Sequence, residues 1–285
     1  MTLIDGKSIS AKVKDEIKSA ASDLAAKGVE PALAVILVGE DAASKTYVAS
    51  KEKACAACGI RSVAHRLSSD VSEAALLELI ENLNEDESID GILVQLPLPK
   101  HIDTNKILEK ISPQKDVDGF SAINVGKLTS GLADGFVPCT PLGVMRLLEE
   151  YGVQIAGKNA VVLGRSNIVG KPMASLLLNA DATVTIAHSK TKNLKQLCAD
   201  ADILVAAVGR VHFVSADMVK EGAVVIDVGI NRGEDGKLRG DVDFDAVAPK
   251  CSLITPVPGG VGPMTIAMLL SNTIKSAKNR LRQRA

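Results

Sequence analysis

The chain has 285 residues, of which 46% are hydrophobic, so it is long and apolar enough to bury more than one core. Its 33 basic and 34 acidic residues leave a net charge of −1, which excludes strong attraction to nucleic acid or an anionic membrane, although residues 275–284 are locally basic. No apolar run approaches a membrane span and the N-terminus does not resemble a secretory signal, so we expect a cytoplasmic protein.

The first part of the chain alternates helices with apolar strands. An opening helix is indicated by apolar residues at helical spacing, namely Ile9, Val13, Ile17 and Leu24, and Gly28 ends it. The elements expected after it are a strand at 32–39, a helix at 42–58, a strand at 61–66, a helix at 72–84 and a strand at 91–96. This alternation predicts a parallel sheet covered by helices.

The five cysteines do not suggest a disulfide framework, because only Cys55 and Cys58 form a C-x-x-C pair. That pair lies inside a predicted helix, away from the helix N-terminus where a thiolate would be stabilised. It also lacks a second pair of ligands for tetrahedral zinc. We therefore expect no redox or metal role for this pair, and such a role is the less favoured alternative.

The helix–strand rhythm stops between Pro97 and Thr140, where Pro, Asp and Gly mark loops, and a helix over residues 141–152 begins with proline. We place the domain boundary there. The prediction is a substrate domain of residues 1–140 plus 264–285 and a dinucleotide domain of residues 141–263. A single compact barrel is the alternative.

A second alternating series occupies the later part of the chain. Its apolar strands are expected in the segments NAVVLGR, ATVTIAH, ADILVAAVG and GAVVIDVGI. Short apolar strands separated by helices are typical of a smaller doubly wound α/β sheet, as in Rossmann-like domains. The last helix, over residues 263–284, is expected to return to the first domain.

A loop at the end of the strand NAVVLG has the position of a dinucleotide-binding turn. It runs from Gly164 to Pro172 and leads into a predicted helix, whose N-terminal amides favour phosphate oxygens. The loop departs from G-x-G-x-x-G, because Ser166 replaces the second glycine and Gly170 comes one residue late. An ordinary tight turn is the alternative, but the order strand, loop and helix favours cofactor binding.

The next strand ends at His188, Ser189 and Lys190, where an NAD site usually carries Asp or Glu for the ribose hydroxyl. Arg165, Ser189 and Lys190 instead suit the additional phosphate of NADP, with a solvated loop as the alternative. His188 either touches the cofactor or caps the strand end. The predicted cofactor contacts are Gly164, Arg165, Ser166, Ile168, Val169, Pro172, His188, Ser189, Ala207, Gly209, Gly229 and Ile230.

The first domain offers several candidate polar side chains, none of which identifies a substrate alone. Tyr47 and Lys51 are four residues apart and so share a helix face, although a solvated pair is the simpler interpretation. Gln95 ends an apolar strand, where open α/β sheets bind ligands, with an amide paired to a loop backbone as the alternative. Asp116 and Asp118 lie in one loop, where one of them is free to cap a turn while the other faces a ligand.

Six segments together resemble the bifunctional methylenetetrahydrofolate dehydrogenase and methenyltetrahydrofolate cyclohydrolase family. They are YVASKEKACAACGI, GILVQLPLP, KDVDGF, PCTPLGV, VVLGRSNIVGKP and PVPGGVGPMT, in the order of the family and across nearly the whole chain. The last two are long and individually rare. The altered glycine pattern of the loop is itself a trait of this family.

The resemblance implies a folate and catalytic site at Tyr47, Lys51, Gln95 and Asp118. It implies that Tyr47 stacks on the aminobenzoyl ring, that Asp118 accepts hydrogen bonds from the pterin, and that Lys51 is the central catalytic group, with Gln95 orienting it. The remaining substrate contacts implied are Leu96, Pro97, Gly262 and Pro263. A carboxylate opposite two pterin donors and an aromatic face against a flat ring suit this ligand.

The implied activity is NADP-dependent oxidation of 5,10-methylenetetrahydrofolate to the methenyl form, followed by hydrolysis to 10-formyltetrahydrofolate. The resemblance also implies a homodimer formed through the dinucleotide domain, and no synthetase domain is expected. One alternative is a dehydrogenase for another small molecule, which failure to bind folate would favour. The other is a non-catalytic dinucleotide sensor, which turnover of any substrate would exclude.

Overall fold

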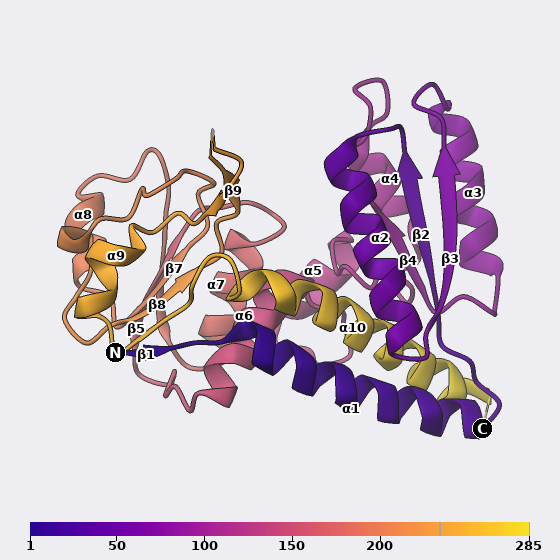
Figure 1. Ribbon diagram of the computed structural model, residues 1–285. Coiled ribbons are helices and arrows are strands. Elements are labelled where there is room, and N and C mark those ends of the chain that lie inside the picture. The colour runs from indigo at the N-terminus through magenta and orange to yellow at the C-terminus, as the bar shows by residue number, and fades with distance from the viewer. Residues whose placement is uncertain (234, 285) are drawn as a thin grey trace. The chain divides into compact units, whose positions relative to one another are not determined.

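The computed structural model describes residues 1–233 and 235–284, which fall into two compact units (Figure 1). Unit 1 comprises residues 1–11 and 140–265, and unit 2 comprises residues 12–139 and those from 266 onward. Helices α1 (Gly6–Ala26) and α10 (Val261–Arg284) each contribute residues to both units. Two of the three unit boundaries therefore lie inside these long helices, and the third falls between Cys139 and Thr140.

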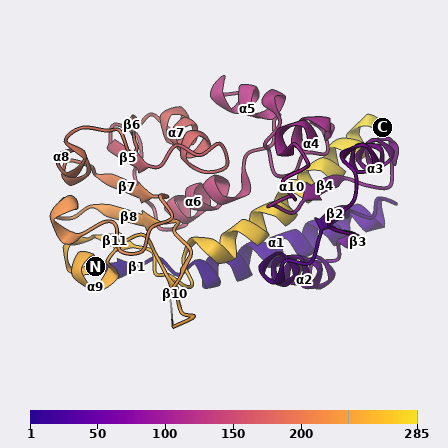
Figure 2. The same ribbon diagram turned by 90° about the horizontal axis from the view of Figure 1, so that it is seen from above.

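Unit 2 is built on a three-stranded parallel sheet of order β3-β2-β4, with β2 at Ala32–Val38, β3 at Arg61–Leu67 and β4 at Gly91–Val94. Every residue of β2 is buried, as expected for a central strand covered on both faces. One face packs against α3 (Glu73–Glu85) and α4 (Thr104–Lys110) in a single apolar cluster. Figure 2 shows α2 (Ala42–Ala57) on the other face.

The ends of α2 follow from local hydrogen bonding and backbone conformation. Asp41 caps the N-terminus, where its carboxylate accepts the N–H of Ser44 at 2.8 Å. Gly59 follows the C-cap residue Cys58 and has φ +72°, a left-handed conformation that glycine adopts without strain. These two ends set the register of the face that carries Tyr47 and Lys51.

Unit 1 contains a six-stranded parallel sheet of order β1-β11-β8-β7-β5-β6. Its strands are β1 (Thr2–Leu3), β5 (Asn159–Leu163), β6 (Thr183–Ala187), β7 (Ile203–Ala206), β8 (Val224–Asp227) and β11 (Leu253–Ile254). A two-stranded antiparallel ribbon of β9 (Asn231–Arg232) and β10 (Leu238–Arg239) follows β8. This is the doubly wound arrangement predicted for the dinucleotide domain.

Helices cover both faces of the larger sheet. Helix α7 (Gly170–Asn179) contacts β5 and β6, while α8 (Leu194–Ala199) and α9 (Phe244–Val247) contribute to an apolar cluster with the sheet. The remaining helical segments are α5 (Ala122–Thr129), α6 (Cys139–Glu150), η1 (Ala216–Met218) and η2 (Ala248–Lys250). The prediction of loops throughout residues 97–140 was wrong, because α4 and α5 form there, each capped by the side chain of the residue before it, Asp103 or Ser121. The sequence placed residues 1–11 with the substrate domain, whereas they group with unit 1 because β1 pairs with β11.

The last helix returns to the first half of the chain, as predicted, and hydrogen bonds within unit 2 hold its end there. The side-chain amide of Asn272 donates to the carbonyls of Val117 and Val137 at 2.7 and 3.0 Å. Arg280 pairs with the buried carboxylate of Asp90 through two hydrogen bonds of 2.7 and 3.0 Å. A paired, charge-assisted contact of this kind orients the helix as well as stabilising it.

All five cysteines are free and buried. Burial raises the pKa of the Cys55 thiol to about 12 and also raises that of Cys58, so neither thiol is activated. Among residues 1–233 and 235–284, no group of His, Cys, Asp and Glu could hold a metal ion. No described helix is both long enough and apolar enough to cross a bilayer.

Candidate functional site

The centre of the site in unit 2 is a hydrogen bond between a residue of helix α2 and the residue that follows strand β4. Lys51 on α2 donates from Nζ to Oε1 of Gln95, directly after β4, at 2.9 Å. The Gln95 amide nitrogen in turn donates to the carbonyl of Leu96 at 2.8 Å. Because a carbonyl only accepts, this second bond leaves the amide oxygen facing Lys51.

The two aspartates of the D-V-D-G loop have different environments. The carboxylate of Asp116 accepts the backbone N–H groups of Phe120 and Ser121 and the side-chain amide of Asn124, at 2.8 to 3.2 Å. It therefore holds the start of α5. Asp118 receives a longer contact, 3.6 Å, from the thiol of Cys139. The hydrogen bonds of the loop and of α5 therefore use the Asp116 carboxylate to hold the backbone, and the Asp118 carboxylate has a different role in the loop.

Asp118 has a perturbed carboxyl group. Desolvation raises its pKa above the ordinary value, and the nearby charge of Lys51 opposes that shift. Asp116 adds a smaller effect in the raising direction. The structure thus brings Lys51, Gln95 and Asp118 together, which the sequence suggested only through the resemblance.

The remaining predicted folate contacts are placed as follows. Tyr47 lies one turn before Lys51 on α2, and 47% of it is exposed. Leu96 and Pro97 follow Gln95 directly and are joined by a cis peptide bond. Gly262 and Pro263 belong to unit 1, near the start of α10. Their contact with a pterin stays a prediction.

Unit 1 contains a cavity of about 320 Å³ at the carboxyl ends of β5, β6 and β7, where open α/β sheets bind ligands. Its lining residues are Leu163, Gly164, Arg165, Ser166, Ala187, His188, Ser189, Leu194, Ala207, Val208, Arg210 and Phe213. Six of the predicted cofactor contacts are among them: Gly164, Arg165, Ser166, His188, Ser189 and Ala207. The turns that follow β5 and β6 thus line the same cavity.

The loop between β5 and α7 is shaped by its glycines and by Ser166. Gly164 has φ +116°, and a Cβ there would lie 2.2 Å from the carbonyl oxygen of Ala207. A Cβ on Gly170 would lie 2.2 Å from the oxygen of Gly164. The Ser166 hydroxyl accepts the N–H groups of Val169 and Gly170 at 3.1 and 3.3 Å. Serine therefore closes the loop that the usual glycine would leave open, and the cradle fits a dinucleotide.

The polar groups of the cavity suit an extra phosphate. Arg165 and Ser189 are both exposed and line it. The ring of His188 accepts the N–H of Lys190 at 3.2 Å, and its backbone N–H donates to the Thr191 hydroxyl at 2.9 Å, so His188 shapes the turn after β6 as well as lining the cavity.

Sequence reasoning missed Arg210 as a lining residue. Its guanidinium lies over the ring of Phe213, 4.9 Å from the centroid, and both residues line the cavity. The sequence position of Arg210 could have identified it. Arg210 comes shortly after the buried strand β7, just as the predicted contact Ser189 comes shortly after β6.

The other predicted cofactor residues do not line this cavity, and their contacts stay predictions. They are Ile168, Val169, Pro172, Gly209, Gly229 and Ile230. Gly229 has a visible structural reason, because a Cβ there would lie 2.3 Å from a carboxylate oxygen of Asp241. Pro172 is buried in the first turn of α7, where its ring suits the helix start.

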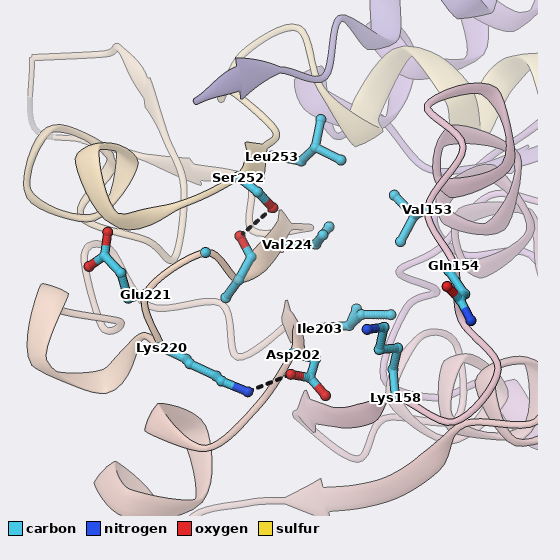
Figure 3. Close-up of a pocket in the computed structure, with 12 residues that line it drawn as sticks. Val153, Gln154, Lys158, Asp202, Ile203, Lys220, Glu221, Val224, Ser252 and Leu253 are labelled. Carbon is cyan, nitrogen blue, oxygen red and sulfur yellow. Dashed lines mark hydrogen bonds and ion pairs between the residues drawn. The ribbon is translucent and has the colours of Figure 1, made fainter.

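A second cavity of about 290 Å³, shown in Figure 3, lies at the opposite end of the same sheet. Its residues Ile203, Val224 and Leu253 are the first of β7, β8 and β11. One of its two carboxylates, that of Asp202, is already paired, because Lys220 donates to it at 2.6 Å. Substrates of open α/β sheets bind at the carboxyl ends of the strands, so this cavity is not the candidate site.

Comparisons with known proteins agree with this geometry. Residues 4–118 match the catalytic domain of tetrahydrofolate dehydrogenase/cyclohydrolase, and residues 138–281 match its NAD(P)-binding domain. A protein of Campylobacter hominis, named bifunctional protein FolD, is 71% identical over 99% of both chains.

Solved structures show the same relationship. The bifunctional methylenetetrahydrofolate dehydrogenase/cyclohydrolase FolD of Campylobacter jejuni has a TM-score of 0.97 and 59% identity, over 98% of this chain and 99% of that one. The Trypanosoma brucei enzyme, solved with NADP cofactor and an inhibitor, has a TM-score of 0.94 and 42% identity, over 100% and 99% of the two chains. The chain therefore belongs to the tetrahydrofolate dehydrogenase/cyclohydrolase family and carries both its catalytic and its NAD(P)-binding domain.

Proposed function

We propose that Lys51, Gln95 and Asp118 carry the folate chemistry of this bifunctional enzyme. The enzyme oxidises 5,10-methylenetetrahydrofolate to the methenyl form with NADP and hydrolyses that product to 10-formyltetrahydrofolate. The observation that carries the residue assignment is the 2.9 Å hydrogen bond from Lys51 to Gln95, beside the carboxyl of Asp118. An amine, a neutral amide and a carboxylate on separate elements are the groups that the two steps require.

In the oxidation, a hydride leaves the methylene carbon and the adjacent folate nitrogen lone pair stabilises the resulting methenyl cation. Bound NADP supplies the hydride acceptor. No side chain needs to form a bond to substrate in this step, so the chain contributes orientation. Asp118 would hold the pterin by accepting two N–H bonds, and Tyr47 would orient the aminobenzoyl ring by its face.

In the hydrolysis, Lys51 moves protons. Water adds to the methenyl carbon while the Lys51 amine takes a proton from it. The ammonium then returns a proton to the ring nitrogen as the carbon–nitrogen bond breaks, and loss of the remaining hydroxyl proton forms the carbonyl. One proton is released overall. Gln95 keeps the Lys51 nitrogen in place through Oε1 without adding a charge that would favour one protonation state.

For the cofactor, Arg165 and Ser189 would bind the additional phosphate of NADP. A fixed guanidinium forms paired hydrogen bonds to phosphate oxygens, and the hydroxyl adds a neutral donor. Both side chains belong to turns that end parallel strands of unit 1 and line the same cavity. The absence of Asp or Glu among the lining residues removes the group that an NAD site uses.

An absorbance time course with methylenetetrahydrofolate tests this function. NADP-dependent growth of reduced nicotinamide, followed by methenyl decay faster than in buffer, would support both reactions. Reduction followed by uncatalysed decay would leave a dehydrogenase alone. Absence of reduction with either NADP or NAD would contradict the folate assignment.

The Asp118→Asn variant should lose folate affinity and its dependence on pH. Only the charged carboxylate accepts both pterin donors, and burial raises the pKa of Asp118. Folic acid should therefore bind the natural protein more weakly as pH falls through that raised pKa, above the ordinary range of aspartate. Fluorescence titration across this pH range measures the effect, and a variant that retained the same pH dependence would contradict it.

The same substitution should stabilise the free protein at neutral pH. A carboxyl whose pKa is raised by folding contributes stability that is complete below its ordinary pKa and is lost as pH rises through the raised value. Asparagine carries no charge and has no such loss. Thermal unfolding without ligand should give a higher midpoint for Asp118→Asn at neutral pH and a smaller difference in acid, so a lower midpoint at neutral pH would count against the assignment.

We also propose that the protein is a cytoplasmic homodimer formed through unit 1, without a nucleic acid or membrane partner. The edge strand β6 ends the larger sheet, and Ile186 on it is 39% exposed. An open sheet edge with an apolar side chain favours pairing with a second copy. Light scattering should give twice the mass of the 29.8 kDa chain, whereas a single-chain mass at micromolar concentration would contradict the dimer.

A further inference from the structure

The carboxylate of Asp241 is fully buried and satisfies three consecutive backbone N–H groups. One oxygen accepts from Val208 and Gly209 at 2.6 and 3.0 Å, and the other accepts from Arg210 at 2.9 Å. The second oxygen also accepts the side-chain amide of Asn231 at 2.9 Å. A buried charge is tolerated when several donors surround it, and here three of the four donors belong to one loop.

That loop follows β7 and forms part of the NADP cavity, because Ala207, Val208 and Arg210 line it. The sheet does not hold Val208 to Arg210, since its hydrogen bonds to this segment end with the N–H of Ala207, which donates to the carbonyl of Leu163 at 2.8 Å. Asp241 supplies the hydrogen bonds that the ladder no longer provides. The position of this wall therefore depends on one side chain that does not itself line the cavity.

A second carboxylate holds Asp241 in turn. Asp227, at the end of β8, accepts the backbone N–H groups of Asp241 and Val242 at 3.0 and 2.9 Å. Glycines make room for both groups, because a Cβ on Gly240 would lie 1.9 Å from a carboxylate oxygen of Asp227, and one on Gly229 would lie 2.3 Å from a carboxylate oxygen of Asp241. The two carboxylates thus connect the ends of β8 and β7 through the segment after β10.

We propose that Asp241 is a positioning residue for NADP, acting through the Val208–Arg210 wall of the cavity. The proposal rests on the NADP site assigned above to that cavity. This role differs from general stabilisation of the fold. Loss of the carboxylate should displace the wall and weaken binding of the dinucleotide, while the folate chemistry of unit 2 stays unchanged.

The Asp241→Asn variant tests this. The amide replaces one accepting oxygen with a donor that faces donors, so the loop loses part of its support. The dissociation constant for NADP should rise about tenfold or more, the scale expected for a lost hydrogen bond to a charged group. Hydrolysis of methenyltetrahydrofolate uses no dinucleotide, so its rate in the same sample should stay within about twofold and reports correct folding.

Asp202→Asn is the matched control. Asp202 lies in the same unit at the opposite end of the sheet (Figure 3), and its carboxylate also accepts a backbone N–H, that of Asn159, at 3.0 Å. This variant should bind NADP like the natural protein. Equal weakening in both variants would overturn the specific role of Asp241, as would a parallel fall of NADP binding and hydrolysis in Asp241→Asn.

Two further variants cover the case in which Asp241→Asn does not fold and the case in which NADP does not bind in this cavity. If Asp241→Asn does not fold, Asn231→Ala removes only one donor to the carboxylate and should still raise the NADP dissociation constant about threefold, the scale of a modest hydrogen-bond loss. An unchanged constant there would overturn the proposal. Arg165→Gln tests the cavity itself. If NADP binds more weakly to Arg165→Gln but normally to Asp241→Asn, only the role of Asp241 is rejected. If NADP binds normally to both variants, the assignment of the NADP site to this cavity is rejected.

Discussion

The Lys51→Met variant is expected to lose methenyltetrahydrofolate hydrolysis by about 100- to 10,000-fold, the range for removal of a general acid–base group. Methionine keeps an unbranched side chain that reaches as far as the lysine Cε and removes the nitrogen that donates to Gln95. NADP binding should be unchanged, because the cavity of Gly164 and Arg165 lies in the other unit. Decay of methenyl absorbance and NADP titration measure the two quantities separately.

Lys53→Met is the matched control for this experiment. Lys53 lies two residues away on the same helix, is exposed, and projects from a different part of the helix surface. Loss of a charge or a change in helix stability would affect both variants alike. Hydrolysis in Lys51→Met at the level of Lys53→Met would reject proton transfer by Lys51, and loss in both would indicate damage to α2.

The second large effect is expected from Gly164→Ala, which should abolish measurable NADP binding. The new methyl group would lie 2.2 Å from the Ala207 oxygen, well inside van der Waals contact, and the backbone there has φ +116°. The loop and the end of β7 have to separate, at a cost of about 2–4 kcal/mol in the free energy of unfolding. Calorimetry with NADP and thermal unfolding measure the two consequences.

Gly157→Ala separates the two causes of the effect expected in Gly164→Ala, which are the positive φ and the close approach to the Ala207 oxygen. Gly157 also has a positive φ, +75°, but a Cβ there meets nothing within 4 Å. Its cost should be limited to backbone strain of about 1 kcal/mol, and NADP should bind normally. Comparable loss of binding in both variants would show that backbone conformation, and not the close approach to Ala207, limits the site.

Much of the fold was predictable because the local pattern and the tertiary contacts agree. The strand β2 is a continuous apolar run, and a run of this kind folds only with cover on both faces. The alternation of such runs with amphipathic helices predicted two parallel sheets and their order along the chain. The loop from Gly164 to Gly170 was placed correctly at a strand end, since strand, loop and helix follow one another directly.

The folate site was less accessible to this reasoning, because its members are far apart in the chain. Lys51 and Gln95 are 44 residues apart, and their hydrogen bond exists only because β2 brings α2 and the end of β4 onto one sheet. Similarity to a known family suggested the set, but nothing in the residue pattern distinguished Asp118 from Asp116. The hydrogen bonds of Asp116 to the start of α5 make that distinction.

The sequence by itself determined most helices and strands of the two sheets and the position of the loop that begins at Gly164, because these depend on local periodicity and on backbone preferences near each residue. Only the tertiary structure decided the pairing of Lys51 with Gln95, the support of the Val208–Arg210 wall by Asp241, and the pairing of β1 with β11 in unit 1. Each of these joins segments distant in the chain. Such contacts depend on how whole elements pack, and no short window of residues contains that information.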